Sequence, residues 1–244
     1  MRHSIATAIA APLLVLAAAP SLASQTTLTF QHGMNGYAGT ADTYLRASEP
    51  DTVFGGESEV SIDASDGGMP SQALLRFDNL FGSGAGQIGA DRVIVSATLR
   101  LFITSAGSGM RVHEMLVPWT EGTASWTSMG DGIQADGSEA TTLPLFELGA
   151  NDGSANIPEE PLTLDMSLAL QRLQAGLASG HGWALLPFMP DGTNGLDFAS
   201  REWAEIADRP LLTVVTAPVP EPATVVSMFA GLALLGALAK RRRG

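Results

Sequence analysis

Histidines and acidic residues are the side chains with which this chain could do chemistry, and their spacing offers little for catalysis. The 244 residues contain no cysteine, so thiol nucleophiles, thiolate metal sites and disulfides are excluded. His32, His113 and His181 show no metal-ligand spacing, and no Gly-x-Ser-x-Gly motif supplies a nucleophile to pair with one of them. We therefore expect no catalytic residue and a protein that is not an enzyme.

Glu121, two residues after Trp119, raises the alternative of a polysaccharide hydrolase or lyase. Glycoside hydrolysis needs two carboxylates held at a fixed separation. Acidic residues are so frequent in this chain that neighbouring carboxylates are expected by chance. A structural role for Glu121 in a turn is the interpretation we favour.

Acidic and amide side chains also raise the question of calcium. Asp191, Asn194 and Asp197 offer oxygen ligands around one predicted hairpin turn. A second loop offers Asp131, Asp136 and Glu139. Neither set follows the EF-hand spacing. We expect no cofactor, and a structural calcium ion at the first set stays an open alternative.

An exposed aromatic residue could serve as a platform for a sugar, because the apolar face of a pyranose stacks on an aromatic ring. The candidates are Trp203, Arg201 on the same predicted strand face, and Tyr37 in a glycine-rich loop, whereas the other tryptophans are expected in the core. Arg46, Arg76, Arg100 and Arg201 all lie on predicted strands. We expect them to pair with acidic neighbours across strands or, alternatively, to form a sugar- or carboxylate-binding stripe.

The elements that must position these residues are mostly strands. Alternating or β-rich runs occur at residues 26–31, 41–47, 58–64, 71–78, 92–104, 110–117, 124–127, 143–148, 161–164, 182–189, 196–203 and 210–216. Residues 128–140 are rich in Gly and Asp and read as a loop. Short strands punctuated by turns predict an all-β fold, a jelly-roll-like antiparallel β-sandwich.

The longest run, residues 92–104, is the clearest strand. Its expected inner face holds Val93, Val95, Ala97, Leu99, Leu101 and Ile103. One helix interrupts the strands: Asp165 or Ser167 caps it, its apolar face runs from Leu170 to Leu177, and Gly180 ends it.

The two ends of the chain read as targeting segments. Arg2 and His3 precede an apolar run over residues 5–19, and Ser21-Leu22-Ala23 forms a small-x-small cleavage site, which predicts a signal peptide over residues 1–23. Near the other end, residues 223–239 are apolar and uncharged, at the short limit for a membrane-spanning helix. The positive charges that follow them orient that helix with its end in the cytoplasm.

Charge limits what the domain between these ends can bind. Five of the 13 basic residues lie at the two ends, as does one of the 25 acidic residues, so residues 24–219 carry a formal charge of −16. Such a domain cannot neutralise the phosphates of a nucleic acid, and an anionic lipid surface repels it. We expect no nucleic acid partner.

Three parts in order make the tail at residues 218–244 resemble a PEP-CTERM sorting signal, also called an ice-binding protein C-terminal domain. The turn Pro220-Glu221-Pro222 comes first, then the apolar helix, then Lys240, Arg241, Arg242 and Arg243. The resemblance implies a Gram-negative bacterium, an exosortase-type processing enzyme as partner, transient residence in the inner membrane through the helix, and exopolysaccharide production nearby.

Five blocks within residues 24–217 resemble the DNRLRE domain, which is related to disaggregatase repeats and a family of carbohydrate-binding modules. The blocks are 42–55, which opens Asp-Thr-Tyr-Leu-Arg-Ala, then 73–78, 96–101, 119–126 and 198–212. The resemblance implies a non-catalytic jelly roll that binds polysaccharide or serves as a surface module.

Together these patterns predict an exported protein of the cell surface, outer membrane or extracellular matrix. Its sandwich is expected to bind a polysaccharide, with exopolysaccharide as the candidate partner. The alternative is a structural protein of the envelope or biofilm matrix that has no affinity for glycans.

Overall fold

The computed structural model describes residues 24–65, 69–189 and 194–219, together with isolated tail positions at 230–232, 235 and 241. Residues Gln25–Pro218 form one compact unit. Its strands are β1 (Thr26–Gln31), β2 (Thr40–Arg46), β3 (Glu59–Ile62), β4 (Ser71–Phe77), β5 (Arg92–Ser105), β6 (Gly109–Glu114), β7 (Phe146–Gly149), β8 (Pro161–Asp165), β9 (Trp183–Pro187), β10 (Leu196–Ala199) and β11 (Leu211–Pro218).

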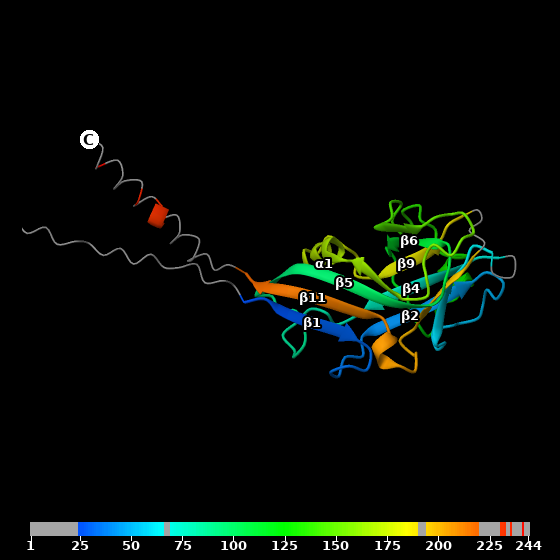
Figure 1. The fold of residues 1–244 in the computed structure, drawn as a ribbon, viewed down its shortest axis with the longest axis horizontal. Coiled ribbons are helices and arrows are strands. Elements are labelled where there is room, and N and C mark those ends of the chain that lie inside the picture. Colours follow the sequence, from blue (N-terminus) through cyan, green and yellow to red (C-terminus); the bar gives the residue numbers. More distant parts are fainter. Residues whose placement is uncertain are drawn as a thin grey trace, which may run out of the picture. The chain divides into compact units, whose positions relative to one another are not determined.

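These strands build two antiparallel sheets, as Figure 1 shows. The first sheet has the order β1-β11-β5-β10-β3, with β8 paired to β5, and the second has the order β2-β4-β9-β6-β7. Helix α1 (Ser167–Gln174) packs against β5, and short 3-10 turns occur at Thr127–Met129 and Ile206–Asp208. The predicted all-β antiparallel sandwich with one short helix is confirmed.

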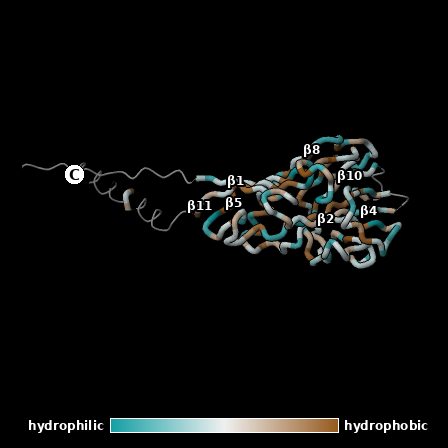
Figure 2. Tube along the Cα trace, turned by 90° about the horizontal axis from the view of Figure 1, so that it is seen from below, coloured by the Kyte–Doolittle hydropathy of each residue, from teal (hydrophilic) through white to brown (hydrophobic). Residues whose placement is uncertain are grey.

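A single apolar core joins the two sheets. Phe30, Leu101 and Phe198 of the first sheet share one cluster of buried side chains with Leu75 and Leu185 of the second. The strands supply it by alternation, because successive side chains of a strand point to opposite faces. In Figure 2 hydrophobic and hydrophilic colours accordingly succeed one another along the strands.

The longest strand, β5, departs from its predicted alternation at one end. Ala97, Leu99, Leu101 and Ile103 are buried as expected, but Val93 and Val95 are 40% and 42% exposed. The pairing with β11 shifts register there: Val215 lies opposite Ser96, and Thr216 lies opposite Ile94. A β-bulge inserts one residue and reverses the faces, so Ile94 takes the inward position and the expectation for Val93 and Val95 was wrong.

The second sheet is buried on its outer face as well. There Leu45, Leu74 and Leu186 pack against Met129 and Ile133, which belong to the stretch between β6 and β7. We call residues 115–144 the cover segment, since they lie over this face. The sequence predicted a plain loop for much of this stretch, and a strand for residues 124–127, which is wrong because a 3-10 turn begins at Thr127.

The helix α1 is shorter than predicted. The carboxylate of Asp165 accepts a hydrogen bond from the amide of Ser167 at its start, at 2.9 Å. The helix ends at Gln174 and is followed by Gly176, whose φ of +69° is the left-handed conformation that closes helices. Leu177 therefore lies beyond the helix and is exposed, and Gly180 is not its end.

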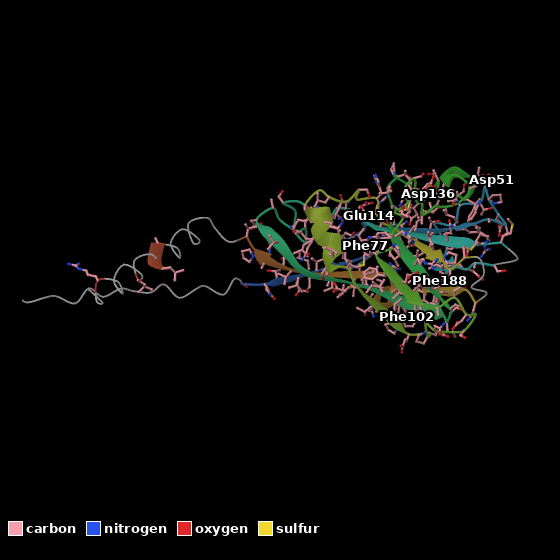
Figure 3. All side chains as sticks on the ribbon, turned by 90° about the horizontal axis from the view of Figure 1, so that it is seen from above. Asp51, Phe77, Phe102, Glu114, Asp136 and Phe188 are labelled. Carbon is pink, nitrogen blue, oxygen red and sulfur yellow. The ribbon has the colours of Figure 1, made fainter. Side chains whose placement is uncertain are left out.

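Several of the sequence predictions concern residues that the structure does not describe. The predicted signal peptide and nearly all of the apolar run at 223–239 lie outside the described residues, as does most of the hairpin turn at 191–195. Within the residues that are described, no helix has the length and apolar character needed to cross a membrane. Figure 3 shows Asp51 and Asp136 at the periphery of the domain, with Phe77 and Phe188 inside it.

Candidate functional site

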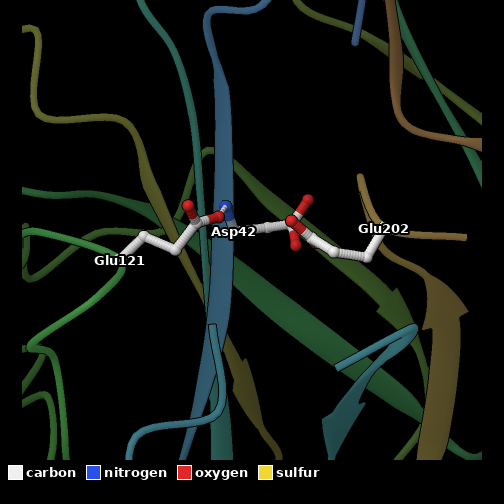
Figure 4. A group of neighbouring side chains, drawn as sticks. All are labelled: Asp42, Glu121 and Glu202. Atoms are coloured by element: carbon white, nitrogen blue, oxygen red, sulfur yellow. Dashed lines mark hydrogen bonds between the residues drawn. The ribbon is translucent and has the colours of Figure 1, made fainter. Parts of the chain in front are cut away.

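Three carboxylates from distant parts of the chain meet beside strand β2. Asp42 lies on β2, Glu121 on the cover segment and Glu202 just after β10, and Figure 4 shows Asp42 between the other two. Oxygen atoms of all three lie within 4.8 Å of one another. We call these residues the acid cluster. Hydrogen bonds build it: the amide of Asp42 donates to Glu121 Oε1, and the amide of Arg201 donates to Asp42 Oδ2, each at 2.9 Å.

The guanidinium of Arg201 neutralises part of this charge. Its Nη2 lies 2.5 Å from Glu121 Oε2, and its Nε lies 2.7 Å from Glu202 Oε1. The side chain of Arg201 is 24% exposed and that of Glu121 is 15% exposed, so both ends of this ion pair are largely withdrawn from water. Arg201 supplies the positive charge that a bound cation would otherwise bring to the cluster.

Burial changes the acidity of the cluster. Desolvation raises the pKa of Asp42 well above its usual value, and the neighbouring Glu202 and Glu121 charges raise it further. Desolvation also raises the pKa of Glu121, although hydrogen bonding and the Arg201 charge oppose this change. The two carboxyls therefore hold protons more tightly in the folded protein than in the unfolded chain.

The residues predicted to bind sugars lie in different settings. The side chain of Arg201 is paired with Glu121 and Glu202 of the acid cluster. The Tyr37 hydroxyl donates to the carbonyl of Asp78 at 2.9 Å, and its ring meets that of Phe30 edge to face at 5.3 Å. Trp203 is partly exposed, and its carbonyl accepts from Arg209 Nε at 2.7 Å.

The candidate calcium ligands are only partly covered by the structure. Asp191 lies outside the described residues. Asn194 and Asp197 lie at the start of β10, where Asn194 Nδ2 donates to the carbonyl of Ala106 at 3.5 Å. The calcium site there stays a prediction.

A second feature lies on the outer face of the second sheet, where the cover segment leaves part of it open. It is a depression of about 570 Å³, which we call the sheet depression. Its lining includes Arg111, His113, Trp126, Pro144, Glu147 and Leu186. Its size lies within the range of about 300–1,000 Å³ that is usual for small-molecule sites.

The indole of Trp126 forms an aromatic wall of this depression. It is held against the backbone of Gly132, where a β-carbon would lie only 2.6 Å from ring atom Cη2. Gly132 also has a φ of +89° and donates its amide to the carbonyl of Trp126 at 3.1 Å. Glycine is thus needed at 132 for both space and conformation. Trp126 was expected in the core, but it is partly exposed.

The floor of the depression carries a charge pair and a histidine. Arg111 on β6 lies opposite Glu147 on β7, with Nε 2.5 Å from Oε1, and its guanidinium lies 4.6 Å from the centre of the Phe188 ring. His113 Nδ1 lies 2.6 Å from the carbonyl of Thr141. Burial lowers the pKa of His113, as does the Arg111 charge, so the neutral ring donates from Nδ1 and leaves Nε2 as an acceptor.

The sequence blocks that carry the DNRLRE resemblance supply the acid cluster, but sequence reasoning did not find the sheet depression. Asp42, Glu121 and Arg201 come from the first, fourth and last blocks. For the depression, the signal would have been the spacing of Met129 and Ile133, two apolar residues in an otherwise polar loop. That spacing indicates a loop folded back onto a sheet, with a partly covered tryptophan beside it.

Comparison with known proteins bears on the tail. Residues 218–243 match the model of the PEP-CTERM protein-sorting motif. No curated protein matches the chain. The motif indicates an exported protein that is sorted in association with the membrane, which confirms the predicted sorting signal and export and is consistent with an exosortase as the processing partner.

Arg201→Met tests whether the acid cluster depends on its arginine. Removing the guanidinium leaves the partly buried Glu121 and Glu202 without their counter-charge, so we expect the free energy of unfolding to fall by about 3 kcal/mol. Urea unfolding of the fragment 24–219 measures it. As a control, Arg172→Met removes a more exposed arginine, 4.0 Å from Glu114, and should cost less than about 1 kcal/mol. Equal effects of the two changes would contradict a stabilising role for Arg201.

Asp42→Asn tests the raised pKa of the cluster. A carboxyl whose pKa is raised by folding contributes stability that is full below its unfolded pKa, near about 4, and is lost as the pH rises through its folded pKa. Asparagine can still accept from the Arg201 amide but does not titrate. We expect Asp42→Asn to gain stability relative to the wild type as the pH rises from about 4 to 8, measured by urea unfolding in EDTA. Parallel stability curves for the two proteins would refute the raised pKa.

Proposed function

We propose that this protein is a non-catalytic, polysaccharide-binding protein of the cell surface or extracellular matrix, delivered there by its PEP-CTERM tail. The observation that carries the proposal is the match of residues 218–243 to the sorting motif. Sorting tails of this kind, on the resemblance described above, belong to bacteria that make exopolysaccharide. A protein released into such a matrix meets polysaccharide as its main neighbour.

The fold supports a binding module. An antiparallel sandwich of about 200 residues is the architecture that the DNRLRE resemblance implies. The blocks that carry the resemblance are joined in space: Arg76 of the second block donates to the carbonyl of Trp119 in the fourth at 2.8 Å and lies 4.8 Å from the centre of its ring. These contacts give residues of two of the blocks a structural role in the domain.

The acid cluster supports binding rather than hydrolysis. Glycosidases hold their two carboxylates about 5–9.5 Å apart on either side of the substrate. Here the oxygens lie within 4.8 Å, and Arg201 is paired with two of the three carboxylates. This arrangement favours a structural role for Glu121 and Glu202. The acid cluster therefore gives the enzyme alternative no support.

The charge of the domain further limits which polysaccharides can be its partner. A formal charge of −16 over residues 24–219 favours neutral polymers over polyanions unless cations bridge the two. The alternative of a structural matrix protein without glycan affinity keeps the same tail and the same fold. Binding therefore has to be measured.

Affinity electrophoresis distinguishes these functions. The fragment 24–219, which contains the compact unit, is run through gels containing dextran, hydroxyethylcellulose, mannan, alginate or polygalacturonate, with and without calcium. We expect at least one polysaccharide to retard it relative to a gel without polymer, with serum albumin as the non-binding control. Unchanged mobility in every gel would overturn the proposal and favour the structural matrix protein.

A further inference from the structure

We propose that the sheet depression is the glycan-binding site of the domain and that it takes a neutral pyranose chain, with Trp126 as the stacking platform. This inference rests on the proposed function and deepens it by naming the site and the class of sugar. The site differs from the one that sequence analysis favoured, which was centred on Trp203, Arg201 and Tyr37.

The lining of the depression combines apolar and polar side chains. Trp126, Pro144 and Leu186 give apolar walls, whereas Arg111, His113 and Glu147 give polar groups on the floor. A pyranose has the same division, with an apolar C–H face and a rim of hydroxyls. Sites for such ligands are mostly apolar, with a few convergent polar groups that fix orientation.

The indole of Trp126 is held in one position before any ligand binds. Gly132 lies against the indole of Trp126 and leaves no room for a side chain of its own. The indole is therefore held on one side by backbone, while it lines the depression. A ring fixed in this way loses little conformational entropy when a ligand stacks on it, which favours binding.

The floor of the depression offers hydrogen-bond donors and acceptors for the hydroxyls of a sugar. A guanidinium carries five N–H donors, and Arg111 directs Nε to Glu147 while its plane lies near the Phe188 ring. Glu147 is about half exposed and offers carboxylate oxygens as acceptors. His113 borders the floor but is only 3% exposed, and Nε2 is its remaining acceptor because Nδ1 is bound to the carbonyl of Thr141. Donors and acceptors thus lie together on one floor, as a sugar hydroxyl requires.

The charge of the depression and of the domain around it favours neutral sugars over acidic ones. The positive charge of Arg111 is matched by Glu147, so the floor has no excess of positive charge to attract a carboxylate. The domain around it is strongly acidic. A uronate chain would bring further negative charge into this surface and would be repelled. A neutral chain meets no such barrier.

Tryptophan variants of the fragment 24–219 test the site in the same polysaccharide gels. Trp126→Ala should weaken binding of the neutral polymer about tenfold or more, because the stacking surface is lost. Trp126→Phe retains an aromatic face and should recover most of the affinity. Trp203→Ala removes a partly exposed tryptophan outside the depression and should bind like the wild type. Thermal unfolding of each variant checks that it is folded.

The outcomes separate the site from the function. If the wild type binds neutral polymers and Trp126→Ala binds equally well, the sheet depression is not the site, although polysaccharide binding stands. The same conclusion follows if Trp203→Ala is the variant that loses binding. If alginate or polygalacturonate retards the wild type and no neutral polymer does, the sugar class is wrong. If no polymer binds the wild type, the proposed function itself fails. If Trp126→Ala is unfolded, the indole N–H signal of Trp126 in the wild type decides: a shift on titration with an oligosaccharide of the neutral polymer supports the site, and an unmoved signal contradicts it.

Discussion

The ion pair between Arg201 and Glu121 is the interaction on which the architecture around the second sheet depends. It fastens the beginning of the cover segment to the end of β10, with Asp42 of β2 between them. Further polar contacts hold the rest of that segment, and two of them lie near its middle and its end. The side-chain amide of Gln72 exchanges two hydrogen bonds with the backbone of Ile133, at 2.7 and 3.2 Å, and His113 Nδ1 donates to the carbonyl of Thr141. An irregular loop that has one isolated bridge, between Met115 and Ala140, in place of regular strand pairing needs such contacts, because its buried backbone groups must otherwise find partners in water.

These contacts turn an exposed sheet face into a second core with an opening. Met129 and Ile133 bury the apolar residues of β2, β4 and β9. Beside the cover segment and Trp126, Arg111 and Glu147 stay partly exposed on the floor of the depression, whereas His113 is only 3% exposed and is bound to Thr141 of that segment. The acid cluster and the sheet depression are therefore related: the first fixes the segment whose edge forms the second. One is a structural device and the other is the surface where we place the ligand.

The sequence predicted the fold well because its strands alternate, and it predicted the site poorly because the cover segment does not. Thr26–Gln31 and Ser71–Phe77 were found almost to the residue, the first from its β-rich composition and the second from its period-2 alternation, although Ser71–Phe77 proves to be buried on both faces. Val93 and Val95 were misplaced because a bulge is a pairing event that a single strand does not reveal. Arg201 and Trp203 were predicted to face outward together. Instead, the Arg201 guanidinium pairs with Glu121, some 80 positions away in the chain, and the Arg201 amide donates to Asp42, some 160 positions away. Trp126 could not be separated from the core tryptophans by type alone, because its exposure depends on where the cover segment ends.

The central claim is that one tryptophan of four, Trp126, contacts the bound glycan. The indole N–H signals of the fragment 24–219, labelled with nitrogen-15 at tryptophan, test it directly during titration with an oligosaccharide of the neutral polymer that binds. Trp119 and Trp183 are buried, and Trp203 lies outside the depression lining. We expect the signal of Trp126, assigned from the Trp126→Phe variant, to shift with increasing ligand while the other three stay in place. A shift confined to Trp203, with Trp126 unmoved, would contradict the account.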